Sequence, residues 1–176
     1  MPKIIEDVKK RILKTSKKRL LIDGYSRLAI RDIAADCDIA VGTVYNYFKS
    51  KDMLVGAVMV EDWRRAVERM SGDCRDVKSL NDGLRAIYDG IVDFSAIYKS
   101  VWREYSFTGS SLYSFSERHL LLRSQLVEII LPLLSRFRKD EDEFVPVFLA
   151  ECLLTASSDR TLEYKKLDEI FKRLFK

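Results

Sequence analysis

This chain of 176 residues is 47% hydrophobic and 33% charged, a composition that excludes a disordered protein and can supply a folded core. Its formal net charge is +4, but residues 1–51 carry 12 Lys and Arg against six Asp and Glu, whereas the remainder is slightly acidic. A basic end on a nearly neutral body is typical of a module that faces phosphates and is joined to a second part.

Few residues of this chain suit a metal or a cofactor. Its three cysteines, Cys37, Cys74 and Cys152, are far apart and form no CxxC pair, and His119 is the single histidine. This pattern predicts reduced thiols, no zinc site and no cofactor. No apolar run approaches the ~20 residues of a membrane span, and the charged N-terminus does not resemble a signal peptide. We therefore expect a soluble cytoplasmic protein.

Helical spacing of apolar residues predicts an all-α protein with about nine helices and no strand. The first helix should cover residues 4–23, with its Lys and Arg side chains mostly outside. Gly24 can end it by taking a positive φ. Pro132 should kink the longest helix. The further helices are expected at residues 30–36, 41–48, 51–70, 80–96, 97–107, 112–138, 144–158 and 162–174.

Residues 29–51 have the pattern of a helix, a tight break at 37–40 and a second, short helix. In the second helix Val44 and Phe48 lie four residues apart and should face inward, so that Thr43, Asn46 and Tyr47 face outward. A short helix locked by its inner face onto a preceding helix fits the DNA major groove. The pattern predicts a helix-turn-helix and hence DNA binding.

The predicted DNA-binding residues divide into two roles. Thr43, Tyr47 and Lys51 are placed to reach phosphates, and Gly42 allows close approach to the duplex. The other groove-facing positions are candidates for reading base edges, because Asn can pair with adenine and Val can contact a thymine methyl. Tyr45 could instead pack partly on the first helix. The full predicted set is Arg31, Val41, Gly42, Thr43, Tyr45, Asn46, Tyr47 and Lys51.

Residues 12–58 resemble the tetracycline-repressor (TetR) family of bacterial and archaeal one-component regulators. The run Gly-Thr-Val-Tyr-x-Tyr-Phe-x-x-Lys, which begins at Gly42, is the most specific part of the resemblance. The resemblance implies phosphate contacts for Thr43, Tyr47 and Lys51. It also extends to Ile12-Leu13, Leu20, Gly24-Tyr25, Arg31-Asp32-Ile33-Ala34, Ile39, Ser50, Asp52 and Leu54.

Three positions depart from the pattern of this family. Ala29 and Ala40 stand where Thr or Ser is usual, so both helices of the motif should lack a side-chain N-cap, at roughly 1 kcal/mol each. Asp38 replaces the usual glycine of the turn, and Asp tolerates left-handed backbone better than most residues. We expect the turn to form despite these changes.

The resemblance implies two domains, a DNA-binding domain at 1–50 and an effector-binding and dimerisation domain at 51–176. Family members dimerise through their last two long helices, and two recognition helices ~34 Å apart then read a palindrome. The same apolar stripes could instead form an intramolecular core. The candidate interface residues are Phe144, Phe148, Cys152, Thr155, Leu167 and Phe171.

An effector pocket, if present, should lie among the helices between Leu80 and Arg136, where aromatic residues are frequent. Aromatic walls with a few polar groups suit hydrophobic or cationic ligands. The alternative is that these aromatics are ordinary core and that His119 is a satisfied surface histidine. The candidate effector-binding residues are Tyr88, Tyr98, Trp102, Arg103, Tyr105 and His119.

The resemblance therefore implies a prokaryotic transcriptional regulator, most often a repressor in this family. It would bind double-stranded DNA at an inverted repeat as a homodimer, and a small-molecule effector would tilt helix 51–70. The alternative is a body that binds a protein partner instead of a small molecule. An enzyme is not expected, because the chain has no glycine-rich phosphate loop, no GxSxG and no HExxH.

Overall fold

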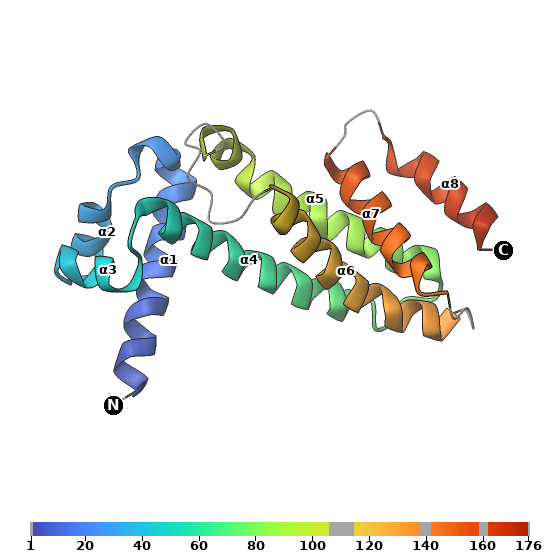
Figure 1. Ribbon diagram of the computed structural model, residues 1–176, viewed down its shortest axis with the longest axis horizontal. Coiled ribbons are helices and arrows are strands. Elements are labelled where there is room, and N and C mark those ends of the chain that lie inside the picture. Colours follow the sequence, from blue (N-terminus) through green and yellow to red (C-terminus); the bar gives the residue numbers. More distant parts are fainter. Residues whose placement is uncertain (1, 106–114, 138–141, 159–161, 176) are drawn as a thin grey trace. The chain divides into compact units, whose positions relative to one another are not determined.

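The computed structural model describes residues 2–105, 115–137, 142–158 and 162–175. These residues form eight α-helices and no strand, which confirms the all-α prediction (Figure 1). None of the helices in these ranges is long and apolar enough to cross a membrane. The helices are α1 (Pro2–Arg27), α2 (Ile30–Asp36), α3 (Val41–Tyr47), α4 (Lys51–Asp73), α5 (Leu80–Tyr105), α6 (Phe115–Phe137), α7 (Phe144–Ser158) and α8 (Tyr164–Leu174).

One expected break is absent. The two helices predicted at 80–96 and 97–107 form the single helix α5, which explains why the described ranges hold eight helices instead of about nine. The buried residues of α5 keep alternating spacings of three and four across the expected break, so one face stays apolar throughout. These buried residues are Leu84, Ile87, Ile91, Phe94, Tyr98 and Val101. Helix α4 continues to Asp73, three residues beyond the predicted end at 70. Helix α6 is assigned as one helix that contains Pro132.

The backbone of α1 leaves helical geometry at Gly24, which has φ 79° and ψ 170°. This confirms the predicted positive φ, but helical turns resume beyond the kink and run to Arg27. A non-glycine residue would be strained in this conformation. Gly24 thus separates the long basic part of α1 from the short segment that leads into α2.

The chain divides into two compact units. The first contains residues up to Trp63 together with the segment that begins at Ile97, and the second contains Arg64–Ala96 and the segment that begins at Tyr113. Helices α4 and α5 therefore each contribute residues to both units. The division at 50/51 by role remains a proposal.

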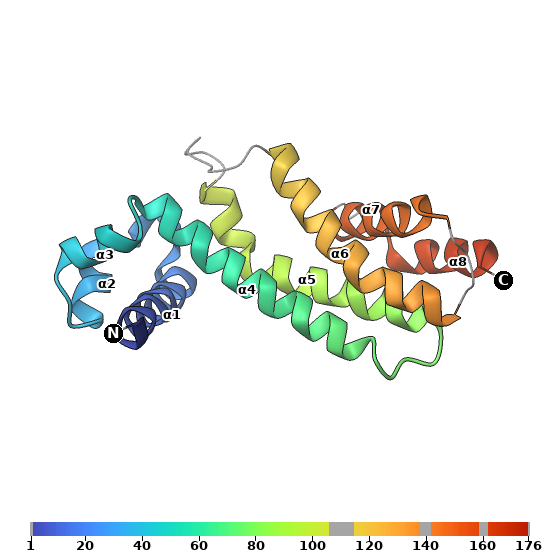
Figure 2. The same ribbon diagram turned by 60° about the horizontal axis from the view of Figure 1, so that its bottom comes forward.

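Each unit has its own apolar core. In the first unit the fully buried residues include Ile12, Leu20, Ile33, Val44 and Leu54, which come from α1 to α4. In the second unit α7 packs against α6, and α8 packs against α7 (Figure 2). The buried residues there include Leu84, Ile87, Leu126, Ile130, Leu149 and Phe171.

Candidate nucleic-acid interface

The pairing of α2 and α3 depends on a few buried side chains. Ile33 and Ala34 of α2 are 0% and 1% exposed, and Val44 of α3 is fully buried. Phe48, which is also buried, ends α3 with an extended backbone while its N–H donates to the Val44 carbonyl at 2.9 Å. The inner face predicted for α3 is therefore confirmed.

The turn between the two helices is a Schellman motif. The Ile39 N–H donates to the Ala34 carbonyl, and the Asp38 N–H donates to the Ala35 carbonyl, both at 3.0 Å. Asp38 takes the left-handed conformation that this motif requires, with φ 49°. Ala29 and Ala40 provide no side-chain cap, as expected from the sequence. Tertiary packing and backbone bonds hold the motif in place of the missing caps.

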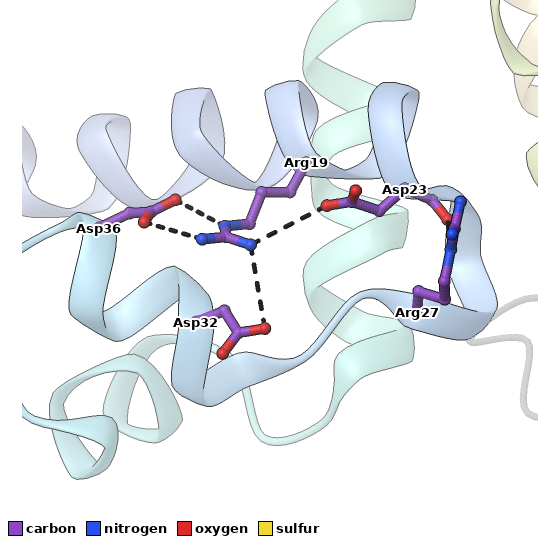
Figure 3. Close-up of polar contacts among 5 residues, drawn as sticks. All are labelled: Arg19, Asp23, Arg27, Asp32 and Asp36. Atoms are coloured by element: carbon purple, nitrogen blue, oxygen red, sulfur yellow. Dashed lines mark hydrogen bonds and ion pairs between the residues drawn. The ribbon is translucent and has the colours of Figure 1, made fainter.

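A charged cluster around Arg19 ties α1 to α2 (Figure 3). The Arg19 guanidinium contacts both oxygens of Asp36, with Nε 2.5 Å from Oδ2 and Nη2 2.8 Å from Oδ1. Its Nη1 atom lies 3.8 Å from Asp32 and 3.9 Å from Asp23, while Arg27 bonds the Asp23 carbonyl. The hydrogen bond from Arg19 lowers the pKa of the Asp36 carboxyl. This cluster therefore attaches α1 to the side of α2 that carries Asp32 and Asp36.

The outer face of α3 presents the predicted groove residues to solvent. Val41 and Tyr45 are 37% and 44% exposed, and Gly42 and Asn46 are exposed as well. No atom lies within 4 Å of a Cβ built on Gly42, so this side of the helix is open. The 44% exposure of Tyr45 leaves much of its side chain at the surface, as a groove-facing role requires.

The predicted phosphate-contacting residues border this face and are less exposed. Thr43 and Tyr47 are half-buried, and the Tyr47 ring lies 6.4 Å from the ring of Phe48. Arg31 is exposed on α2. The side chains of Thr43 and Tyr47 both keep part of their surface accessible to solvent.

Lys51, a predicted phosphate contact, has intramolecular partners in this structure. Its Nζ donates to the Ser26 carbonyl at 3.2 Å and lies 4.4 Å from the centre of the Tyr25 ring. Burial lowers the pKa of this half-buried lysine. The Tyr25 hydroxyl in turn donates to Asp52. No local sequence pattern indicates these contacts, since they join residues 25 or more positions apart.

Most of the basic charge predicted for the N-terminal part is found on the surface of α1, but Arg19 and Lys17 are paired with carboxylates. Lys17 contacts the buried Asp62 at 2.5 Å and is 36% exposed. The other basic side chains keep that part of α1 positively charged. The exposed ones between Asp7 and Leu20 are Lys9, Lys10, Arg11, Lys14 and Lys18.

The predicted effector-binding residues do not gather around one described cavity. Tyr98 is fully buried in the first unit, where its hydroxyl donates to Asp62 Oδ2 at 2.6 Å. Tyr88 belongs to the second unit, and its ring lies 4.5 Å from that of Tyr164. Arg103 is exposed. The side chains of Trp102 and Tyr105 lie outside the described part of the structure.

His119 has a carboxylate partner. Its Nε2 lies 2.8 Å from Glu151 Oε1, and Arg123 approaches the other oxygen of Glu151 at 3.6 Å. These contacts fit the alternative of a satisfied surface histidine. In the described ranges no group of three or more His, Cys, Asp or Glu is arranged to hold a metal.

Two adjoining cavities of about 200 and 340 Å³ lie between α4 and α6 in the second unit. They share Ser71, Arg75 and Ile129, and neither is lined by a predicted effector-binding residue. The smaller cavity adds Pro132, Leu133 and Arg136, so its wall combines apolar groups with two arginines. The sequence pattern did not indicate this place, because none of the residues that line the two cavities is aromatic.

The predicted dimer residues separate into exposed and buried ones. Phe144 and Phe148 on α7 are 67% and 37% exposed and stack on each other at 6.3 Å, and Thr155 is exposed on the same helix. Cys152 and Leu167 are half-buried. Phe171 is fully buried within its own unit, so we correct its assignment from an interface residue to a core residue. It lies seven positions after the buried Tyr164, on the inner face of α8.

Comparison with known proteins agrees with this geometry. Residues 12–58 match the family model described as bacterial regulatory proteins, tetR family. Over 59 residues the chain is 32% identical to the HTH-type transcriptional regulator UidR of Escherichia coli strain K12, a match that covers 34% of this chain and 30% of UidR. The UidR protein of Shigella flexneri matches to the same extent. The aligned region thus spans less than a third of these curated relatives.

Two solved structures are similar over most of the chain. A TetR-family transcriptional regulator from Pectobacterium atrosepticum superposes with a TM-score of 0.68 at 16% identity, covering 89% of this chain and 83% of that one. A TetR-family regulator from Streptomyces coelicolor gives a TM-score of 0.57 at 16% identity, covering 86% and 80%. At these identities the likeness concerns the fold.

Proposed function

We propose that this chain is a regulator of the TetR family, and that it binds DNA and acts as a repressor, because its residues 12–58 match the model of that family. The observation that carries the proposal is the exposed face of α3. The pair of α2 and α3 is held by its buried side chains, by the backbone bonds of the turn and by the bond from Arg19 to Asp36. The relatives named above are regulators and not enzymes, in line with the expectation from the sequence.

In the proposed complex α3 enters the major groove. Val41, Tyr45 and Asn46 read base edges, and Gly42 lets the backbone approach the duplex. Arg31, Thr43 and Tyr47 contact phosphates on either side. Lys51 joins them by exchanging its bond to the Ser26 carbonyl for a phosphate oxygen, so part of its contribution is offset by the contact that it gives up.

We propose that the regulator is a homodimer formed through α7 and α8. The support is the exposed apolar surface of these helices, which includes Phe144, Phe148, Ile170 and Leu174. Isologous pairing of this surface would place two α3 helices on successive turns of a palindromic operator. A regulator of this kind works where the chromosome is, which in a prokaryote is the cytoplasm.

We propose that a small-molecule effector bound by residues 51–176 modulates DNA binding. The candidate residues remain Tyr88, Trp102, Arg103, Tyr105 and His119, and the cavities between α4 and α6 are a second candidate place. The alternative, a body that binds a protein partner, is favoured by one observation. The predicted effector-binding residues line neither of the two described cavities.

The operator-binding proposal is tested by selecting random duplex DNA with the purified protein at moderate salt. We expect an enriched inverted repeat with half-sites about one helical turn apart. A folded protein that enriches no sequence would contradict the proposal and favour the partner-binding alternative.

The residue roles are separated by two variants measured on the selected repeat. Asn46→Ala should relax the sequence preference, whereas Tyr47→Phe, which removes a neutral hydroxyl, should weaken binding to all DNA and leave the slope of log affinity against log salt unchanged. Lys99→Gln, which removes an exposed charge on α5, should change neither property. An unchanged selected motif for Asn46→Ala would show that Asn46 does not read a base.

A further inference from the structure

The kink at Gly24 leaves backbone N–H groups that need hydrogen-bond acceptors from elsewhere in the chain. Because helical geometry breaks there, the N–H groups that follow stand at the start of a new turn, where backbone donors lack helical acceptors. In most helices a local Ser, Thr, Asp or Asn caps such donors. Here the acceptor comes from a helix that lies far along the sequence.

Glu104 of α5 provides that cap. Its Oε2 accepts hydrogen bonds from both the backbone N–H and the Oγ of Ser26, each at 2.7 Å. These two bonds lower the pKa of the Glu104 carboxyl, which is therefore ionised and a strong acceptor at neutral pH. The carboxylate of Glu104 thus does what an N-cap residue does, from 78 positions away.

The carboxylate also fits the space that the kink leaves. A Cβ built on Gly24 would lie 3.2 Å from Glu104 Oε1, so the absence of a side chain at Gly24 gives Glu104 its room. On the other side Lys51 holds the carbonyl of the same Ser26 and adds a favourable charge next to Glu104. Ser26 is therefore held by α5 through its N–H and by α4 through its C=O.

A second contact joins the same part of α5 to α1. Asp62 of α4 is only 7% exposed, and its Oδ2 contacts both the Tyr98 hydroxyl and the Lys17 ammonium, at 2.6 and 2.5 Å. Tyr98 and Glu104 lie within the segment of α5 that belongs to the first compact unit. The two contacts attach α1 to α5 on both sides of the kink.

We infer that Glu104 is a positioning residue for DNA binding, an inference that rests on the proposed function. By capping the turn at Ser26, it fixes the connection through which α1 carries α2 and α3. Glu104 touches no base or phosphate in this role. Its removal should loosen the recognition helix pair without changing what that pair contacts.

The test compares Glu104→Ala with Glu104→Gln on the inverted repeat that the wild-type protein selects. Glu104→Ala should raise Kd about tenfold, since a charge-assisted cap is lost, whereas Glu104→Gln retains an acceptor oxygen and should stay within about threefold. Asp93→Ala removes an exposed carboxylate from the same helix and should leave Kd unchanged. In all three variants the salt slope and the selected sequence should equal those of the wild type.

Two outcomes would overturn the inference. If Glu104→Ala and Glu104→Gln tighten binding equally, the carboxylate acts only through its charge on DNA. If Glu104→Ala lowers the salt slope by about one unit, Glu104 acts by presenting Lys51 to a phosphate and not by positioning the helix pair.

Hydrogen exchange without DNA separates this inference from the proposed function. The Ser26 amide should exchange about tenfold faster in Glu104→Ala than in the wild type, with amides of α6 and α7 unchanged as an internal check of folding. Unchanged exchange at Ser26 overturns the inference whatever the DNA result. A wild-type protein that selects no repeat contradicts the proposed function, and the exchange measurement then decides whether the cap exists.

Discussion

Asp62 illustrates what single residues contribute to this molecule. A buried carboxylate is costly unless it is paired and hydrogen-bonded, and Asp62 obtains both from Lys17 and Tyr98. The sequence predicted a surface position for Lys17 and an effector-binding role for Tyr98. Neither prediction could include Asp62, because helical spacing shows which face of one helix is apolar and not which distant residue it meets.

Replacing Tyr98 by Phe should therefore destabilise the protein. The variant keeps the ring in the core but leaves Asp62 without its hydroxyl donor, which should lower the free energy of unfolding by about 1–3 kcal/mol. Urea unfolding followed by circular dichroism measures the change.

Tyr164→Phe is the matched control for this prediction. The Tyr164 hydroxyl is buried and has no hydrogen-bond partner among the described residues, so its removal should be neutral or slightly stabilising. Equal losses of stability in the two variants would show that the bond from Tyr98 to Asp62 contributes nothing specific.

At the scale of the helices, the sequence predicted best where several local signals coincide. The bounds of α2 were predicted to the residue, and those of α3 to within one, because an apolar inner face and a turn mark both ends. The break predicted within α5 was wrong because no Gly or Pro enforces one and the apolar spacing continues. The Glu104 cap could not be predicted, since its two partners are far apart in sequence.

Gly42→Ala should separate the stability of α3 from its proposed function. Gly42 lies in an open helical position, so Ala should raise the free energy of unfolding by about 0.5–1 kcal/mol. The added methyl group would stand where the duplex must approach, and DNA affinity should fall. A Cβ built on Gly56 of α4 also has no atom within 4 Å, so Gly56→Ala should raise the free energy of unfolding by a similar amount without weakening DNA binding. Unchanged affinity in Gly42→Ala would contradict the proposed approach of α3.

The bond between Arg19 and Asp36 should make the attachment of α2 to α1 sensitive to acid. Arg19 lowers the pKa of Asp36 in the folded state, so this contact stabilises the fold above the unfolded pKa of about 4 and is lost as pH falls through the lower folded pKa. Asp36→Asn should be less stable than the wild type at pH 7, and the difference should shrink towards pH 3. Thermal unfolding at several pH values checks this, and a difference independent of pH would refute it.

At the scale of the whole molecule, the sequence predicted a basic end and a second part but not how the chain is shared between units. The charge pattern can be predicted because it depends only on the number of charged residues in each part of the sequence. The division into units depends on which residues pack together, and α4 and α5 each belong to both. The proposed domains at 1–50 and 51–176 describe roles, while the compact units describe packing.

The proposed dimer predicts the effect of a charge on α7. Phe144→Glu changes a residue that is 67% exposed, so the fold should survive while the apolar surface is disrupted. Sedimentation should show a dimeric wild type and a monomeric variant. Leu131→Glu, at a 46% exposed position of α6, should remain dimeric. A monomeric wild type would refute the proposal.

The shared helices also bear on how this protein is made. The first compact unit needs Tyr98 and Glu104, which leave the ribosome well after Trp63. At roughly 5–20 residues per second, Tyr98 follows Asp62 by about 2–7 s. During that interval the nascent N-terminal segment has its basic charge and its recognition helix but lacks Tyr98 and Glu104, through which α5 holds α1. We therefore expect a half-made chain to be a poor competitor for the operator, so that incomplete translation products do not interfere with regulation.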